Sequence, residues 1–177
     1  MATPALPLDT TGAVVLHPHP SMGGDSSHPF VVDVAARLAA LGATVATPDL
    51  HDPDVTTSAA ALTDVAQSLE CDRVVLVGYS WGSIVASHAT PARLAGRVLV
   101  APPASMPLGA SGAMTPTLVL VPENDQYGGP DATQAALAGH LLVAMEVIPG
   151  ADHFLWGSIE AIAQRCADWL TEASAQA

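Results

Sequence analysis

A serine at the centre of the run Gly78-Tyr79-Ser80-Trp81-Gly82 is the residue of this chain best placed for nucleophilic chemistry. The residues before it, 73–77, form a short β-branched apolar run, and residues 82–89 have the composition of a helix, so the serine falls on a strand-to-helix turn. In so tight a turn, side chains placed two positions before and two after the serine would collide, which explains the two glycines. We therefore predict that Ser80 is a nucleophile.

A serine hydroxyl attacks slowly unless a base accepts its proton, and the base needs a carboxylate that fixes its tautomer. His153 lies in the loop between the last apolar run and the last helical segment, and we predict it as the base. Two carboxylates, Glu123 and Asp125, follow the apolar run 117–121. We choose Asp125 because it lies further into the loop, where it can reach a histidine, and interpret Glu123 as a surface or loop-stabilising carboxylate.

The segment that follows the first apolar run, His17-Pro18-His19-Pro20-Ser21-Met22-Gly23-Gly24, allows two interpretations. Two closely spaced histidines can chelate a metal ion, but no third ligand is spaced near them, so we predict no metal. Alternatively, the glycines let backbone amides approach a ligand and Pro20 fixes the turn, which suits the stabilisation of an oxyanion. On that interpretation the amide of Ser21 is a donor.

The remaining histidines and the cysteines are interpreted as structural. We expect surface or capping roles for four histidines: His28, His51, His88 and His140. Cys71 and Cys166 are far apart and form no Cys-x-x-Cys pattern, which fits structural thiols in a reducing compartment.

Composition excludes several classes of partner. Five Lys+Arg oppose 17 Asp+Glu, giving a net charge of -12, and all the basic residues are arginines. Such a chain has no basic stripe for nucleic acid or anionic membrane. No apolar stretch approaches the roughly 20 residues that span a bilayer, and the first residues lack the features of a signal peptide, so we expect a cytoplasmic protein.

The 177 residues fit a single domain, 1–177, in which strands and helices alternate. Apolar runs without polar alternation, typical of strands covered on both faces, occur at residues 12–17, 43–47, 73–77, 97–101, 117–121 and 142–148. Helical spacing is found at residues 29–41, 58–69, 81–89, 131–138 and 158–172. We predict a six-stranded, mainly parallel sheet in the order 2-1-3-4-5-6 with helices on both faces, and its switch point places Ser21 beside Ser80.

Four segments together resemble the α/β-hydrolase superfamily over nearly the whole chain. They are His17-Pro18-His19-Pro20 with Gly23-Gly24, Gly78-Tyr79-Ser80-Trp81-Gly82, Pro122-Glu123-Asn124-Asp125, and Gly150-Ala151-Asp152-His153-Phe154. The first and last are most similar to small, cap-less, dienelactone-hydrolase-like serine hydrolases of bacteria. The resemblance implies a catalytic triad of Ser80, Asp125 and His153, with the amides of Ser21 and Trp81 as oxyanion donors.

Two departures from the superfamily limit what the resemblance implies. A serine stands where dienelactone hydrolases have cysteine and where epoxide hydrolases and haloalkane dehalogenases have aspartate, so we do not expect those three activities. The superfamily's first two strands are missing, and only the aperiodic residues 102–115 stand where many members insert a cap. We read this segment as a loop and expect a site open to water. The Trp81 side chain either takes space beside the nucleophile or packs under the following helix.

These observations favour a serine hydrolase that cleaves a small carboxylic ester or thioester through an acyl-enzyme, without metal or organic cofactor and with amides less favoured. Two alternatives share the same residues. One is a ligand- or partner-binding signalling module on a hydrolase fold, and the other is an acyltransferase that uses an acceptor other than water.

Overall fold

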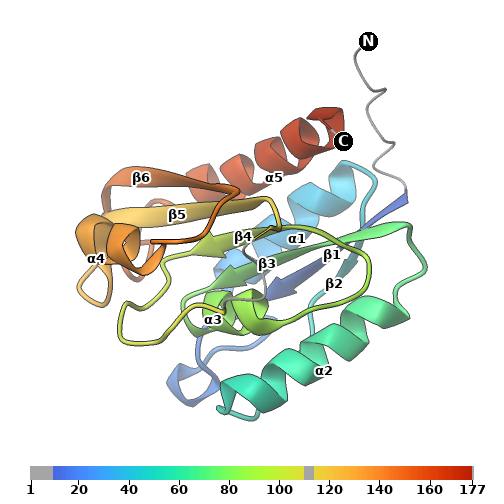
Figure 1. The fold of residues 1–177 in the computed structure, drawn as a ribbon, viewed down its shortest axis with the longest axis horizontal. Helices are drawn as coiled ribbons and strands as arrows, with labels where there is room; N and C mark the ends of the chain where they lie inside the picture. Colours follow the sequence, from blue (N-terminus) through green and yellow to red (C-terminus); the bar gives the residue numbers. More distant parts are fainter. Residues whose placement is uncertain (1–9, 110–113, 177) are drawn as a thin grey trace.

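Six parallel strands form the centre of the protein, in the order β2-β1-β3-β4-β5-β6 (Figure 1). Every neighbouring pair of strands is parallel. The computed structural model describes residues 10–109 and 114–176 of the chain. The strands are β1 (Thr11–Leu16), β2 (Thr44–Ala46), β3 (Arg73–Tyr79), β4 (Leu94–Val100), β5 (Thr117–Asn124) and β6 (Val143–Asp152). The predicted strand order and fold class are confirmed.

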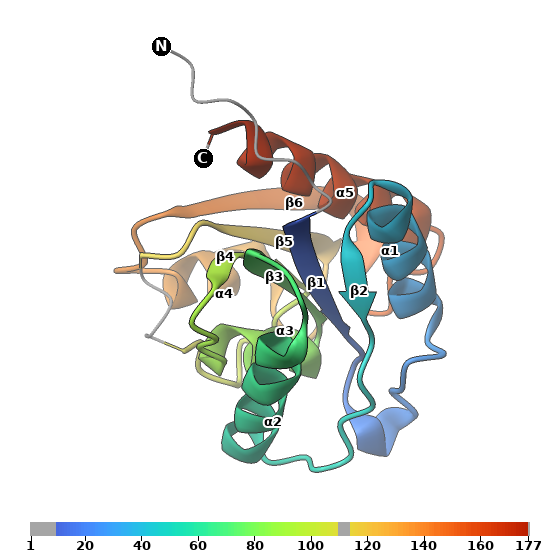
Figure 2. The same cartoon turned by 90° about the vertical axis from the view of Figure 1, so that its right-hand side faces the viewer.

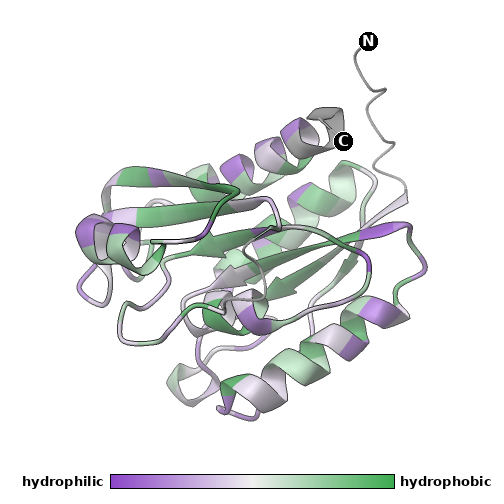
Figure 3. Cartoon of the chain, viewed as in Figure 1, coloured by the Kyte–Doolittle hydropathy of each residue, from purple (hydrophilic) through white to green (hydrophobic). Residues whose placement is uncertain are grey.

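Helices cover both faces of this sheet (Figure 2). The helices are α1 (Pro29–Ala40), α2 (Val55–Ser68), α3 (Trp81–His88), α4 (Gly129–Ala136) and α5 (Ile159–Gln176). Residues of α1 and α5, such as Phe30, Leu38 and Ile162, share one buried cluster with one face of the strands. Residues of α2 and α3, such as Leu62 and Val85, belong to the cluster on the other face. Because both faces are covered, the strands are the most apolar part of the chain (Figure 3).

Capping residues set where the helices begin and end. The Nδ1 of His28 accepts a hydrogen bond from Phe30 N at 3.2 Å, so this histidine caps α1, one of the roles expected for it. Gly42, just after α1, has a φ of 95°, which glycine adopts without strain. Helix α2 begins at Val55, ahead of the predicted residue 58, because the Asp54 carboxylate accepts a hydrogen bond from Thr57 N at 2.8 Å.

No cap domain is seen on this fold among the described residues. Residues 102–109 and 114–115 contain no helix or strand, in agreement with the predicted loop, and the rest of that loop lies outside the described residues. Among residues 10–109 and 114–176, no helix is long and apolar enough to cross a membrane.

The carboxyl ends of the strands converge on one edge of the sheet, because all of them run in the same direction. The predicted functional residues follow four of these ends. The 17–24 loop with Ser21 follows β1, Ser80 follows β3, Asp125 follows β5 and His153 follows β6. In open parallel sheets this edge is where ligands bind.

Candidate active site

Ser80 occupies a strained turn between β3 and α3. Its φ of 54° and ψ of -121° are unusual for a residue with a side chain, and its amide donates to Val100 O at 2.8 Å. A Cβ at Gly78 would lie 2.2 Å from Gly82 O, and a Cβ at Gly82 would lie 2.4 Å from His17 O. The predicted steric reason for both glycines is therefore confirmed.

The structure brings Ser80, His153 and Asp125 into one hydrogen-bonded line. Ser80 Oγ lies 2.9 Å from His153 Nε2, and His153 Nδ1 lies 2.9 Å from both carboxylate oxygens of Asp125. A carboxylate can only accept here, so Nδ1 carries the ring proton and Nε2 is left to accept the serine hydroxyl proton. All three residues are buried. Burial keeps water from competing for these hydrogen bonds.

The two candidate acids occupy different environments. The Asp125 side chain is fully buried, and its Oδ1 also accepts a hydrogen bond from Tyr127 N at 2.8 Å. Glu123 is exposed and accepts a hydrogen bond from Gly150 N at 2.7 Å, so it ties the end of β5 to β6. Of these two carboxylates, only Asp125 bonds to the His153 ring. Glu123 makes a loop-stabilising contact, the role expected for it from the sequence.

Tyr79 anchors the backbone of the loop that carries His153. Its hydroxyl donates to the backbone carbonyl of His153 at 2.7 Å. Burial, followed by the nearby carboxylates of Asp125 and Asp152, raises the pKa of the Tyr79 hydroxyl above its ordinary value. The phenol therefore stays protonated and remains a donor.

The histidines of the 17–24 loop contact protein groups. His17 Nε2 accepts from Leu50 N at 3.0 Å, which leaves the proton on Nδ1 to be donated to Pro18 O at 2.6 Å. His19 Nδ1 accepts from Ser21 N at 3.1 Å. Within the described ranges, no group of three metal-ligating side chains is present. The two rings instead serve the fold of the loop.

The amide of Ser21, predicted as an oxyanion donor, is already engaged with His19 Nδ1. The next three amides of the loop donate to backbone carbonyls: Met22 and Gly24 to His19 O, and Gly23 to Pro20 O. For the backbone amides of His19 and Trp81, by contrast, no acceptor is found in the described part of the chain. In this conformation, the amides of His19 and Trp81 are open, whereas the Ser21 amide is not. The prediction missed that a histidine side chain can cap the turn that follows it.

The Trp81 side chain is buried in one cluster with Val85 and Ala86 of α3, which agrees with the second of its two expected positions, under the following helix. It is 1% exposed, its ring stacks on His17 with the centroids 5.9 Å apart, and its Nε1 donates to Pro53 O at 3.2 Å. The His19 ring meets it edge-on with the centroids 5.5 Å apart. The indole therefore joins the 17–24 loop to the start of α3 and does not form a wall for the substrate.

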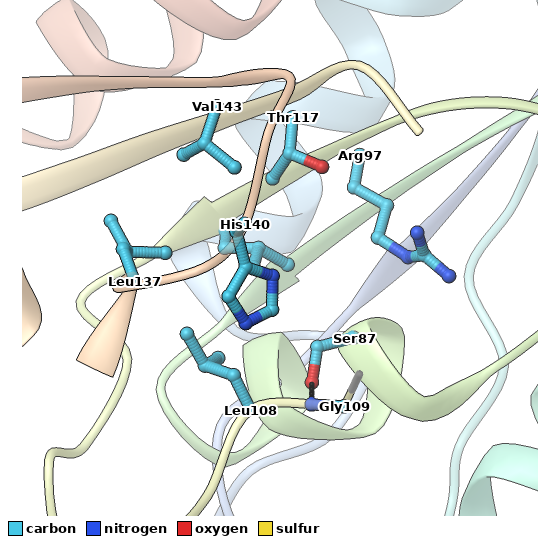
Figure 4. A pocket seen from close by; sticks show the side chains of 9 residues that line it. Ser87, Arg97, Leu108, Gly109, Thr117, Leu137, His140 and Val143 are labelled. Carbon is cyan, nitrogen blue, oxygen red and sulfur yellow. Dashed lines mark hydrogen bonds between the residues drawn. The ribbon is translucent and has the colours of Figure 1, made fainter. Parts of the chain in front are cut away.

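A separate pocket lies toward the opposite edge of the sheet, around Arg97 in the middle of β4 and around Thr117 and Val143, the first residues of β5 and β6 (Figure 4). Arg97 is buried and donates to Ala86 O at 2.9 Å and Ala89 O at 2.8 Å, at the carboxyl-terminal end of α3. Burial lowers the pKa of this guanidinium to about 10, so it is charged at neutral pH. It stabilises the negative end of the helix that carries Ser80 at its start.

A protein-family model matches more than half of the sequence. Residues 13–116 match the model of the alpha/beta hydrolase family, so the chain belongs to that family. The matched residues include the 17–24 loop and Ser80, while Asp125 and His153 lie beyond them. No match is found among curated proteins.

Solved structures with the same fold cover most of the chain. An alpha-beta serine hydrolase homologue from Coxiella burnetii is 23% identical, with a TM-score of 0.73 over 96% of this chain and 89% of that one. A serine hydrolase without a lid from Xanthomonas campestris is 20% identical, with a TM-score of 0.77 over 97% and 86%. Est1E from Butyrivibrio proteoclasticus is 14% identical, with a TM-score of 0.77 over 94% and 89%. These similarities show the fold.

Proposed function

We propose that the protein is a serine hydrolase that cleaves a small carboxylic ester or thioester through an acyl-enzyme intermediate. The observation that carries this proposal is the continuous line of hydrogen bonds from Ser80 Oγ through the His153 ring to the Asp125 carboxylate. A serine with a free hydroxyl is a poor nucleophile, whereas a serine hydrogen-bonded to an oriented imidazole has a base in place. On this proposal, Ser80, His153 and Asp125 are the catalytic triad.

The reaction proceeds in two halves. His153 Nε2 takes the proton as Ser80 Oγ attacks the carbonyl carbon, and then returns it to the oxygen or sulfur of the leaving group as the acyl-enzyme forms. A water molecule, deprotonated by the same nitrogen, then attacks the acyl-enzyme, and Nε2 returns that proton to Ser80 Oγ as its bond to the acyl group breaks and the acid leaves. Asp125 stays ionised and stabilises the imidazolium present in both halves.

The negative charge on the carbonyl oxygen needs backbone donors. We assign this role to the amides of Trp81 and His19, which are open, rather than to the Ser21 amide, which is bonded to a side chain. The contact between the His19 and Trp81 rings keeps the two residues adjacent. One such donor typically contributes a factor of about 10² to 10³ in kcat.

Two observations support the proposed substrate class: no cap is seen among the described residues, and the structural neighbours include serine hydrolases. A chain with no cap among its described residues leaves the acyl group in contact with water, which favours small substrates. Two of the similar structures are described as a serine hydrolase and as a serine hydrolase homologue, and Est1E was solved with ferulic acid bound. Each step above uses groups of this chain, so the proposal invokes no cofactor.

Pre-steady-state kinetics with p-nitrophenyl acetate test the proposal. We expect a burst of about one p-nitrophenol per protein, followed by steady turnover as the acetyl-enzyme hydrolyses. Ser80→Ala and His153→Ala should each remove most of the rate enhancement, and the double variant should lose little more, because the residues act as a unit. A burst without turnover would favour the binding-module alternative, and full activity in Ser80→Ala would overturn the proposal.

A further inference from the structure

Two exposed aromatic side chains surround the histidine of the site. The Tyr127 ring meets the His153 ring edge-on with the centroids 4.6 Å apart, and the Phe154 ring does so at 5.8 Å. The Tyr127 and Phe154 rings also meet edge-on, with their centroids 6.3 Å apart and their planes nearly perpendicular. Tyr127 is 48% exposed and Phe154 is 40% exposed, so both residues remain accessible to solvent. We call Tyr127 and Phe154 the aromatic rim.

Backbone hydrogen bonds fix the rim in place. Tyr127 N donates to Asp125 Oδ1 at 2.8 Å, and Phe154 N donates to Asp152 Oδ1 at 3.0 Å. Tyr127 O accepts from Ala104 N at 2.9 Å, which joins the rim to the loop after β4. The backbone that carries the rim is thus anchored, and each ring packs against the His153 ring, which limits the freedom that a ligand packed against it would remove.

The chemistry of the proposed reaction decides which part of the substrate the rim meets. His153 Nε2 returns its proton to the oxygen of the leaving group, so that oxygen must come within hydrogen-bonding distance of the imidazole. The rim contacts the same imidazole. The group attached to the departing oxygen, and not the acyl chain, is therefore the part that lies against Tyr127 and Phe154.

We propose that the aromatic rim is a subsite for the alcohol portion of the substrate, and that it selects esters of neutral aromatic alcohols. This inference rests on the proposed function. Aromatic rings favour edge-to-face or offset contacts with other rings, and the rim offers two roughly perpendicular faces to one incoming ring. The Asp152 carboxylate, which accepts the Phe154 amide, disfavours an alcohol that carries its own negative charge.

Three acetates separate this proposal from the function on which it rests. Benzyl acetate and cyclohexylmethyl acetate have the same acyl group and rings of similar size, and differ in aromaticity, while methyl acetate does not reach the rim. We expect kcat/KM for benzyl acetate to exceed that for cyclohexylmethyl acetate by roughly tenfold, the value of one to two aromatic contacts. In Phe154→Leu, and further in the double variant with Tyr127→Leu, this ratio should fall toward one.

The controls make each outcome decisive. Methyl acetate is the internal reference: in each rim variant, kcat/KM for benzyl acetate should fall by a larger factor than kcat/KM for methyl acetate, which does not reach the rim. Leu141→Ala, an exposed residue just before β6 at the opposite edge of the sheet, should keep the wild-type ratio. A ratio near one in the wild type, or a ratio unchanged in the double variant, would overturn the subsite. If none of the three acetates is hydrolysed, the proposed function fails and the subsite fails with it.

Discussion

Tyr79, the residue just before the serine of the site, donates its hydroxyl hydrogen to the backbone carbonyl of His153 at 2.7 Å. The bond joins the end of β3 to the end of β6, so the turn that carries Ser80 also holds the loop that carries the histidine. Tyr79 is 3% exposed, and its raised pKa keeps it a donor over the whole working pH range. The distance between Ser80 and His153 is thus fixed by a second contact outside their own hydrogen bond.

Tyr79→Phe should weaken both the fold and the reaction. It leaves the buried carbonyl of His153 without this donor, which typically costs about 1 to 3 kcal/mol in the free energy of unfolding. We expect kcat for p-nitrophenyl acetate to fall by about tenfold with little change in KM, because the histidine is less well held. Tyr127→Phe is the matched control for stability, since its hydroxyl has no hydrogen-bond partner among the described residues. Urea unfolding and steady-state kinetics measure both effects, and an unchanged kcat would show that the bond does not position His153.

The choice of acid can be tested by two conservative substitutions. Asp125→Asn should lower kcat by about 10⁴, because an amide does not hold the histidine tautomer that the reaction needs. Glu123→Gln should have a mild effect, since that side chain contacts Gly150 N and not the histidine. If steady-state rates showed the larger loss in Glu123→Gln, the assignment of Asp125 would be wrong.

Acyl-chain preference tests the open site. With p-nitrophenol kept as leaving group, kcat/KM should peak between acetate and butyrate and decline toward dodecanoate. Each further methylene meets water rather than protein and gains much less than the roughly 0.8 kcal/mol of full burial. A steady rise through the long chains would instead require an enclosed apolar tunnel.

The two cysteines should differ in reactivity. Cys166 is 1% exposed, and burial raises the pKa of its thiol to about 12, so the reactive thiolate is scarce at pH 8. Cys71 is partly exposed. A disulfide reagent such as dithionitrobenzoate should modify one thiol rapidly in the native protein and the second only after unfolding in guanidinium. Rapid modification of both thiols at pH 8 would show that the α5 face opens readily.

Local patterns predicted most of the fold, because both the strands and the helices have clear apolar periodicity. Two predicted elements began too late in the sequence: a capping residue explains the earlier start of α2, and a long-range contact bears on the earlier start of β4. Strand β4 begins at Leu94, ahead of the predicted residue 97, through a stretch that contains Gly96. A Cβ at Gly96 would lie 2.5 Å from the Trp169 ring of α5, so the glycine is suited to a contact with a helix distant in the sequence. No local pattern contains that information.

The residues of the site also separate into those that local sequence patterns predict and those that depend on long-range contacts. Ser80 and His153 could be placed from the sequence because a turn geometry and a loop position constrain them, and the structure brings Asp125 to the same line. The loop amides could not be assigned, because whether the Ser21 amide is open depends on the orientation of the His19 side chain. The rim was missed for a related reason, since the proximity of Tyr127 to Phe154 depends on the pairing of β5 with β6.

Covalent labelling tests the central claim most directly. A fluorophosphonate probe reacts quickly only with an activated serine, so mass spectrometry of the intact wild-type protein should show a single adduct, and peptide mapping should place it on Ser80. Labelling should be lost in Ser80→Ala and slowed strongly in His153→Ala, with circular dichroism showing that both variants fold. A fluorophosphonate adduct that persists in Ser80→Ala, or that maps to another residue, would contradict the account.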